Sequence, residues 1–525
     1  MNHRITRRMS ALVALPAALM LAACGGDNDG DDPSAIDARS KLAFGPCAVA
    51  ISDPSAICGT LTVPEERTDK ASRSIGLPFA ILPAKAAAPE KDPVVIFTGG
   101  PGPSPLQGLA AIPAESLQQF PLRQKRDMIV MTHRGTDLTT PSSLDCKELV
   151  LDFAAGERFA SEDAVVQAAQ ACRDRLVAAG VKLGSYTTKA IARDMEELRV
   201  LLGNERGFGP RNVVGSSYGS RLALATMRDA PQGVRSVVLD GPLLLQERPL
   251  YRAEVLDGLS NVLAACNAQA DCAAAYPTLQ ARFAAAIEKL ETTPVLVNGT
   301  RVRGHDVLNA MRGALSVSEP AYGSVPLFME RIAKGDLAGA DTVLPFLSNL
   351  ILAINPEGMF YTVTCTDDAG LTTSESNELP AAGAGWPDAV RRLVAKNKLR
   401  VQARTCPLWT QGVNLPADEL RPLRSDLPTL ITVGQFDVAT PVTSADLLLP
   451  DLSRARKVVF TGRGHGLLES DTCMPKVAAA FLDDPKAAPD TSCIDAADSL
   501  RFVTPTLVQA QKAALQTGVQ QVLRE

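Results

Sequence analysis

The sequence predicts an α/β protein with a mostly parallel central sheet, helices on both faces of the sheet and an inserted, mainly helical cap. Short apolar runs rich in β-branched side chains are bounded by turn residues, and helical patterns lie between some of them. Continuous apolar runs are typical of parallel strands buried on both faces. Between residues 246 and 400 this alternation gives way to Ala-rich helical patterns, which indicates an insertion.

Apolar runs and helical patterns locate the elements of the core. The predicted strands are Val94–Phe97, Met128–Met131, Asn212–Val214, Val234–Leu239, Thr429–Val433 and Lys457–Phe460. Ala190–Leu202 repeats apolar residues at helical spacing, and Arg221–Ala230 is a predicted helix that ends before Pro231. In the insertion, Ala281–Leu290 and Ala389–Ala395 are predicted helices.

The N-terminal segment resembles the export signal of a bacterial lipoprotein. Basic residues precede an apolar run from Ala11 to Ala23, which is too short to span a bilayer. The run ends in Leu-Ala-Ala-Cys24-Gly25, which resembles a lipobox. The resemblance implies a signal peptide over 1–23, lipidation of Cys24 and a flexible tether over 24–40. A plain secretory signal is the alternative, and Gly25 favours the outer membrane as the destination, facing the periplasm or the surface.

The rest of the chain divides into three predicted parts. Residues 41–245 form the N-terminal part of the core, 246–400 the cap insertion and 401–525 the C-terminal part of the core. No later stretch reaches 18 apolar residues, so we expect anchoring by lipid alone. With 53 basic and 58 acidic side chains the net charge is −5, which argues against nucleic acid as a partner.

The cysteines predict disulfides. Ten of the eleven follow Cys24, and an even number in an exported chain favours pairing. Sequence alone does not choose the pairing, and free buried thiols are the alternative. We predict that successive neighbours pair: Cys47 with Cys58, Cys146 with Cys172, Cys266 with Cys272, Cys365 with Cys406, and Cys473 with Cys493. None forms a CxxC motif and histidine is scarce, so no metal and no cofactor are expected.

A candidate nucleophile follows a predicted strand. Gly215-Ser216-Ser217-Tyr218-Gly219 fits the G-x-S-x-G pattern, in which glycines allow a sharp turn between a strand and a helix. Such a turn lifts the central serine, Ser217, above the edge of the sheet. Ser216, one residue earlier, would lie off the tip of the turn. Because chance also produces this short motif, its place after a strand and before a helix carries the prediction.

The base is found by elimination among four histidines. In folds with this elbow the acid and then the histidine follow the serine. His3 leaves with the signal, His133 precedes Ser217 and His305 lies in the insertion. His465 remains, directly after the predicted strand Lys457–Phe460 and between two glycines.

The acid and the oxyanion donors complete the predicted site. Asp437 follows the strand Thr429–Val433, where it could hold the tautomer of the histidine; a surface-loop aspartate is the alternative. The backbone N–H of Tyr218 is one predicted oxyanion donor. The turn Gly99-Gly100-Pro101-Gly102 should supply the second, and we choose the N–H of Gly100 because Pro101 has none. A plain turn without a catalytic part is the alternative.

Together these motifs resemble the α/β-hydrolase serine peptidases of the tripeptidyl aminopeptidase and proline iminopeptidase group, including a TAP-like C-terminal module. The resemblance covers most of the mature chain. It rests on Cys58–Pro64, Gly99–Gly102, Tyr186–Gly203, Gly215–Gly219, Asp229–Pro231, Leu239–Pro242 and the tail with Asp437, His465 and Cys473. The family usually has Asp-x-Arg-Gly-x-Gly after an early strand, whereas this chain has Thr132-His133-Arg134-Gly135-Thr136-Asp137. The departure puts a substrate-binding role of that loop in doubt.

The resemblance implies a serine hydrolase that releases di- or tripeptides from the free N-terminus of peptide substrates. A carboxylesterase or lipase with the same triad is the alternative, and a non-catalytic, peptide-binding envelope lipoprotein is a more remote one. Recognition of a substrate ammonium needs a carboxylate near Ser217. Glu247, Asp367 and Asp368 are candidates, and the sequence singles out none of them.

Overall fold

The computed structural model describes residues 36–141, 143–149, 162–245, 254–316, 319–340, 358–367, 383–413, 423–494 and 500–507. The predicted signal peptide and Cys24 lie outside these ranges. Within them, no helix combines the length and the apolar character needed to cross a bilayer.

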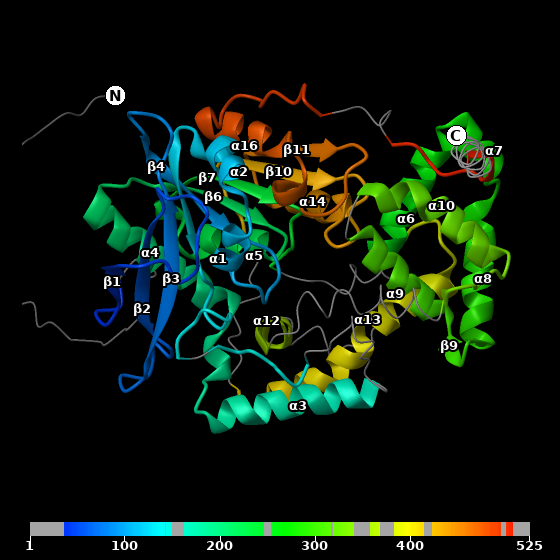
Figure 1. Ribbon diagram of the computed structural model, residues 1–525, viewed down its shortest axis with the longest axis horizontal. Coiled ribbons are helices and arrows are strands. Elements are labelled where there is room, and N and C mark those ends of the chain that lie inside the picture. The colour runs from blue at the N-terminus through cyan, green and yellow to red at the C-terminus, as the bar shows by residue number, and fades with distance from the viewer. Residues whose placement is uncertain are drawn as a thin grey trace, which may run out of the picture. The chain divides into compact units, whose positions relative to one another are not determined.

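A central sheet carries the predicted strands. Its described strands lie in the order β1–β2–β3–β5–β4–β6–β7–β10–β11 (Figure 1). Neighbours from β5 to β11 are parallel, whereas β1, β2 and β3 pair antiparallel. The sheet is therefore mostly parallel, as predicted. The strands are β1 (Lys41–Phe44), β2 (Ile57–Pro64), β3 (Ser74–Leu82), β4 (Glu90–Phe97), β5 (Arg126–Met131), β6 (Arg211–Ser216), β7 (Val234–Asp240), β10 (Thr429–Gly434) and β11 (Ala455–Phe460).

Helices cover both faces of the sheet. In β4, Val95 and Phe97 belong to the apolar core on one face, while Val94 and Ile96 belong to the core on the other. This alternation explains why the run is apolar at every position. The first face is covered by α3 (Glu162–Ala178), α4 (Thr188–Arg206), α5 (Tyr218–Asp229) and α14 (Val442–Leu448), and the second by α1 (Pro105–Ala110), α2 (Ala114–Gln119) and α16 (Met474–Asp483).

The insertion has an apolar core of its own. Its helices α6 (Glu254–Asn267), α7 (Ala270–Ala275), α8 (Leu279–Thr292), α9 (Gly304–Leu315) and α10 (Glu319–Ala333) gather in one group (Figure 1). A hairpin of β8 (Val295–Val297) and β9 (Thr300–Val302) was not predicted. Its turn is Asn298-Gly299 with positive φ at both residues, a strong hairpin signal that the sequence does contain.

Two further helices connect the insertion to the sheet. In α13 (Asp388–Trp409), Val390 packs into the core of the insertion, while Trp409 packs into the core beside the sheet. The helix runs through residue 400, where the sequence placed a domain boundary. The second helix, α12 (Gly358–Asp367), packs against the sheet side. The insertion thus joins the core through a continuous helix.

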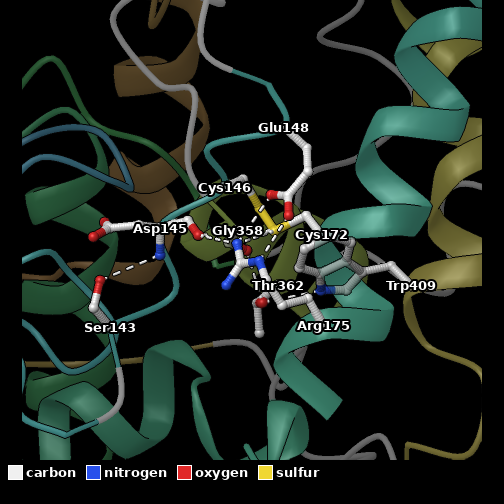
Figure 2. The surroundings of a disulfide bond; sticks show 9 residues. All are labelled: Ser143, Asp145, Cys146, Glu148, Cys172, Arg175, Gly358, Thr362 and Trp409. Atoms are coloured by element: carbon white, nitrogen blue, oxygen red, sulfur yellow. Dashed lines mark hydrogen bonds and ion pairs between the residues drawn. A yellow bond between two sulfur atoms is a disulfide. The ribbon is translucent and has the colours of Figure 1, made fainter. Parts of the chain in front are cut away.

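Disulfides join the two connecting helices to each other and anchor α3 to the segment after β5. All five predicted pairs are disulfides in the structure. Cys146–Cys172 anchors the segment after β5 to α3, and Cys365–Cys406 joins α12 to α13. Beside the first, Trp409 Nε1 donates to Thr362 Oγ1 at 3.0 Å (Figure 2). Glu148 also lies close to this disulfide, but sulfur atoms bound to each other are not thiolate ligands for a metal.

Candidate active site

Ser217 stands at a strained turn between β6 and α5. Its backbone has φ 54° and ψ −120°, a conformation that non-glycine residues rarely adopt. The glycines of the motif are required by close packing. A Cβ on Gly215 would lie 2.3 Å from the carbonyl oxygen of Gly219, and one on Gly219 would lie 1.9 Å from that of Phe97. The geometry is that of a nucleophile elbow, and Ser217 remains partly exposed.

The glycine-rich turn after β4 lies against this serine. A Cβ on Gly99 would be 3.2 Å from Ser217 Cβ and 3.7 Å from its Oγ. The next residue, Gly100, has φ 121° and precedes a cis peptide bond to Pro101. Tyr218, the first residue of α5, is fully buried. The predicted donors Gly100 and Tyr218 thus belong to the two segments that flank Ser217.

Asp437 and His465 form a hydrogen-bonded pair. Asp437 Oδ2 lies 2.8 Å from His465 Nδ1, and the aspartate is only 1% exposed. Its Oδ1 accepts hydrogen bonds from the backbone N–H groups of Ala439 and Thr440, both at 2.8 Å. Because an ionised carboxylate only accepts, Nδ1 of His465 carries the hydrogen and Nε2 is left to act on a substrate.

Thr440 also contributes to this pair. Its hydroxyl lies 2.9 Å from Asp437 Oδ2 and 3.1 Å from His465 Nδ1. Sequence analysis missed this residue. The signal was present in Asp437-x-x-Thr440, because an aspartate at the start of a turn commonly bonds residues two and three positions later.

The charges around His465 favour its protonated form. Burial lowers the pKa of His465, but the Asp437 carboxylate, with Asp240 and Glu469, outweighs burial and raises it to about 9. The imidazole is 18% exposed, so solvent reaches it. A base in this position is therefore held ready to bear positive charge.

The segment Asp240-Gly241 brings serine and histidine to one place. The N–H of Ser217 donates to the carbonyl oxygen of Asp240 at 2.8 Å. A Cβ on Gly241 would lie 3.1 Å from Asp437 Oδ2 and 3.4 Å from His465 Nδ1. In the described part of the chain Ser217 Oγ and His465 are not hydrogen-bonded to each other; such bonds often tighten only when substrate binds.

The insertion packs against the loops that carry Asp437 and His465. Phe436 and Val438, on either side of Asp437, are fully buried in the apolar core of the insertion. From α10, the hydroxyl of Tyr322 lies where a side chain on Gly464 would have to be. The acid of the pair is thus held by the insertion as well as by the sheet. Of the candidate ammonium ligands, Glu247 and Asp368 lie outside the described residues, and Asp367 ends α12.

The loop that departs from the family pattern has a structural role. Arg134 binds Asp194 of α4 through two nitrogens at 2.6 Å, and it donates to the carbonyl oxygens of Glu65 and Ser185 at 2.8 Å. Its neighbour His133 is buried, and burial lowers the pKa of this histidine to about 4, so it is neutral. Arg134 therefore ties the loop after β5 to α4.

Comparison with known proteins gives two family matches. Residues 92–280 match the family described as alpha/beta hydrolase fold, and residues 392–493 match the one described as TAP-like protein. The first range contains Ser217, and the second contains Asp437 and His465.

Individual proteins resemble the chain over most of its length. YuaR of Escherichia coli (strain K12) is 22% identical over 461 residues, which are 84% of this chain and 89% of YuaR. Serine protease Hip1 of Mycobacterium tuberculosis (strain H37Rv) is 26% identical over 472 residues, which are 81% of this chain and 85% of Hip1. The solved structure of a proline iminopeptidase from Mycobacterium smegmatis aligns at 14% identity and a TM-score of 0.35, covering 81% of this chain and 98% of the iminopeptidase.

Proposed function

We propose that this chain, a serine hydrolase with the α/β-hydrolase fold, is a peptidase that releases di- or tripeptides from the free N-terminus of its substrates. The observation that carries the proposal is the hydrogen-bonded Asp437–His465 pair, which lies at the same sheet edge as Ser217 in its strained elbow. Similarity to a relative named as a serine protease favours peptides over esters.

In the proposed reaction Ser217 Oγ attacks the carbonyl carbon of the substrate while His465 Nε2 takes the proton of the serine. Asp437 holds the imidazole and stabilises its positive charge. The backbone N–H groups of Tyr218 and Gly100 donate to the carbonyl oxygen as it becomes negative. His465 then gives its proton to the leaving amine, and water, activated by the same base, hydrolyses the acyl-enzyme to release the peptide and restore Ser217.

A substrate series tests this activity on the full-length protein in detergent. The substrates are a tripeptide anilide with a free N-terminus, the same anilide with an acetylated N-terminus, and a short acyl ester. We expect cleavage of the free-amine anilide by the wild type and none by Ser217→Ala, because removing the nucleophile of a triad costs about 10⁶-fold in kcat. Turnover of the ester with neither anilide cleaved would assign the enzyme to the esterases instead.

We further propose that the enzyme is exported and held by a lipid on Cys24, in the outer membrane of the bacterial envelope. Five disulfides support an oxidising compartment. Cys24→Ala is expected to move the protein from the membrane to the soluble envelope fraction, as followed by fractionation and immunoblotting. A variant that still sediments with the outer membrane would contradict the lipid anchor.

A further inference from the structure

Asp240, the last residue of β7, binds all three segments that carry the proposed triad. Its carbonyl oxygen accepts the N–H of Ser217 at 2.8 Å. Its Oδ1 accepts the hydroxyl of Thr432 in β10, the strand that leads to Asp437, at 3.1 Å. Its Oδ2 accepts the N–H of Leu468, three residues after His465, at 3.0 Å. One buried residue, 1% exposed, thus links the elbow through its backbone carbonyl, and the acid-bearing strand and the segment after the histidine through its side chain.

A second carboxyl group meets Asp240 through one hydroxyl. Ser216 Oγ lies 3.0 Å from Asp240 Oδ2 and 3.2 Å from Glu469 Oε2. Glu469 belongs to α15 (Leu467–Ser470), the short helix that follows His465. A hydroxyl has one hydrogen to donate, and an ionised carboxylate cannot donate. Both contacts are hydrogen bonds only if one of the two carboxyl groups is protonated.

The surroundings of Asp240 and Glu469 also favour one retained proton on the two carboxyl groups. Burial, together with the negative charge of Glu469, raises the pKa of Asp240 to about 7. Glu469 is exposed to solvent, and partial desolvation raises the pKa of its carboxyl as well. Two neighbouring carboxyl groups with few donors between them share a proton more readily than both ionise.

Three carboxyl groups of the described residues act on His465: Asp437 from the loop after β10, Asp240 from β7 and Glu469 from α15. Two other titratable groups nearby have partners elsewhere. Arg463, two residues before the histidine, is paired with Asp471 at 2.8 Å. Tyr322 of α10 lies against Gly464 and donates to the carbonyl oxygen of Leu315 at 3.1 Å.

We propose that Asp240 is a positioning residue, which holds the three triad-bearing segments in register as one half of a carboxyl pair that shares a single proton with Glu469 through Ser216. The proposal rests on the triad proposed above. Asp240 does not replace Asp437 as the partner of the histidine, because its carboxylate is taken by Ser216, Thr432 and Leu468. The pair adds one negative charge near the imidazole, since two carboxyl groups that share one proton carry a single charge between them.

Two substitutions at Asp240 test the positioning role. Asparagine can still accept from Leu468 and Ser216 while its amide donates to Thr432, so Asp240→Asn should keep kcat within about threefold of wild type. Asp240→Ala removes the side-chain bonds to Ser216, Thr432 and Leu468. Because a misplacement of about 1 Å can cost about 10²-fold, we expect kcat to fall at least tenfold. Thermal unfolding monitors folding of each variant. Wild-type kcat in a folded Asp240→Ala, or an equal loss in Asp240→Asn, would overturn the positioning role.

The pH profile of kcat/KM tests the shared proton. If the pair holds one proton, either Asp240→Asn or Glu469→Gln leaves one negative charge, so each should leave the acid limb near its wild-type position. The double variant removes that charge, lowers the pKa of His465 and should move the acid limb to lower pH by at least about half a unit. Two independently ionised carboxylates would instead give a shift in each single variant, which would overturn the shared proton.

Two controls separate this proposal from its premise. Asp53 is also 1% exposed and is paired with Arg123, and among the described residues it makes no bond to the triad-bearing segments, so Asp53→Asn should leave the acid limb in place. Ser217→Ala tests the premise: if it remained active, the proposed function would fail, whatever the Asp240 variants show. If Ser217→Ala is inactive and the Asp240 and Glu469 variants all match wild type, only the present inference fails.

Discussion

Asp437 and Asp240 are two aspartates that are equally buried, each 1% exposed, but their hydrogen-bond partners and neighbouring charges differ. Asp437 accepts hydrogen bonds from two backbone N–H groups, from the Thr440 hydroxyl and from the ring of His465. Asp240 shares one of its donors with a second carboxyl group, and its pKa is raised to about 7. Because the two residues are equally buried, the hydrogen-bond donors and charges around each carboxyl group distinguish the two sites.

The comparison predicts its largest effect at Asp437. An asparagine there can present an amide hydrogen to Nδ1 and stabilise the wrong tautomer, so we expect Asp437→Asn to lower kcat about 10⁴-fold at neutral pH. The matched Asp240→Asn, equally buried, is expected to keep most of its activity. Steady-state kinetics of the two variants side by side measure the difference, and similar losses in both would remove the distinction between the two aspartates.

A smaller effect is expected at the threonines that serve each aspartate. Thr440→Val deletes the hydroxyl between Asp437 and His465, and loss of a hydrogen bond to a charged group should lower kcat about tenfold. Thr432→Val deletes the corresponding hydroxyl at Asp240 and should cost less, because Leu468 and Ser216 still hold that carboxylate. If Thr432→Val were the more damaging change, the account of Asp437 would need revision.

The smallest predicted effect is that stability falls while activity increases as pH rises. The pKa of His465 is raised to about 9 in the fold, against about 6.5 in an unfolded chain. Its stabilising charge is therefore fully present below about pH 6.5 and is lost as pH rises toward 9. Activity needs the neutral imidazole and should rise over the same range. Thermal midpoints and kcat/KM measured from pH 6 to 10 follow stability and activity. As pH rises over this range, the thermal midpoint of Asp437→Asn is expected to fall less than that of the wild type.

Local patterns predicted six of the nine strands of the described sheet and the three residues of the proposed triad. Ser217 was marked by its glycines, His465 by elimination among four histidines and Asp437 by its place after a strand. All three lie at the ends of elements that periodicity can find. Each of the six predicted strands lies within a strand of the sheet.

Contacts between distant segments could not be predicted in this way. Asp240 entered the sequence analysis only within Leu239–Pro242, as part of the family resemblance, because its bond to Leu468 spans 228 residues and its partner Glu469 lies on a four-residue helix. The packing of Phe436 and Val438 into the apolar core of the insertion could not be predicted either, because apolar residues next to an acidic residue are common at strand ends. These contacts depend on how the loops meet in space.

Covalent labelling tests the central claim most directly. The full-length wild type would be treated with a fluorophosphonate probe and digested, and the modified residue located by mass spectrometry, with Ser217→Ala treated in parallel. We predict one label on Ser217 in the wild type, none in Ser217→Ala, and labelling slowed by orders of magnitude in His465→Gln, because the base that takes the proton is gone. A label on another serine, or peptide hydrolysis by unlabelled Ser217→Ala, would contradict the account.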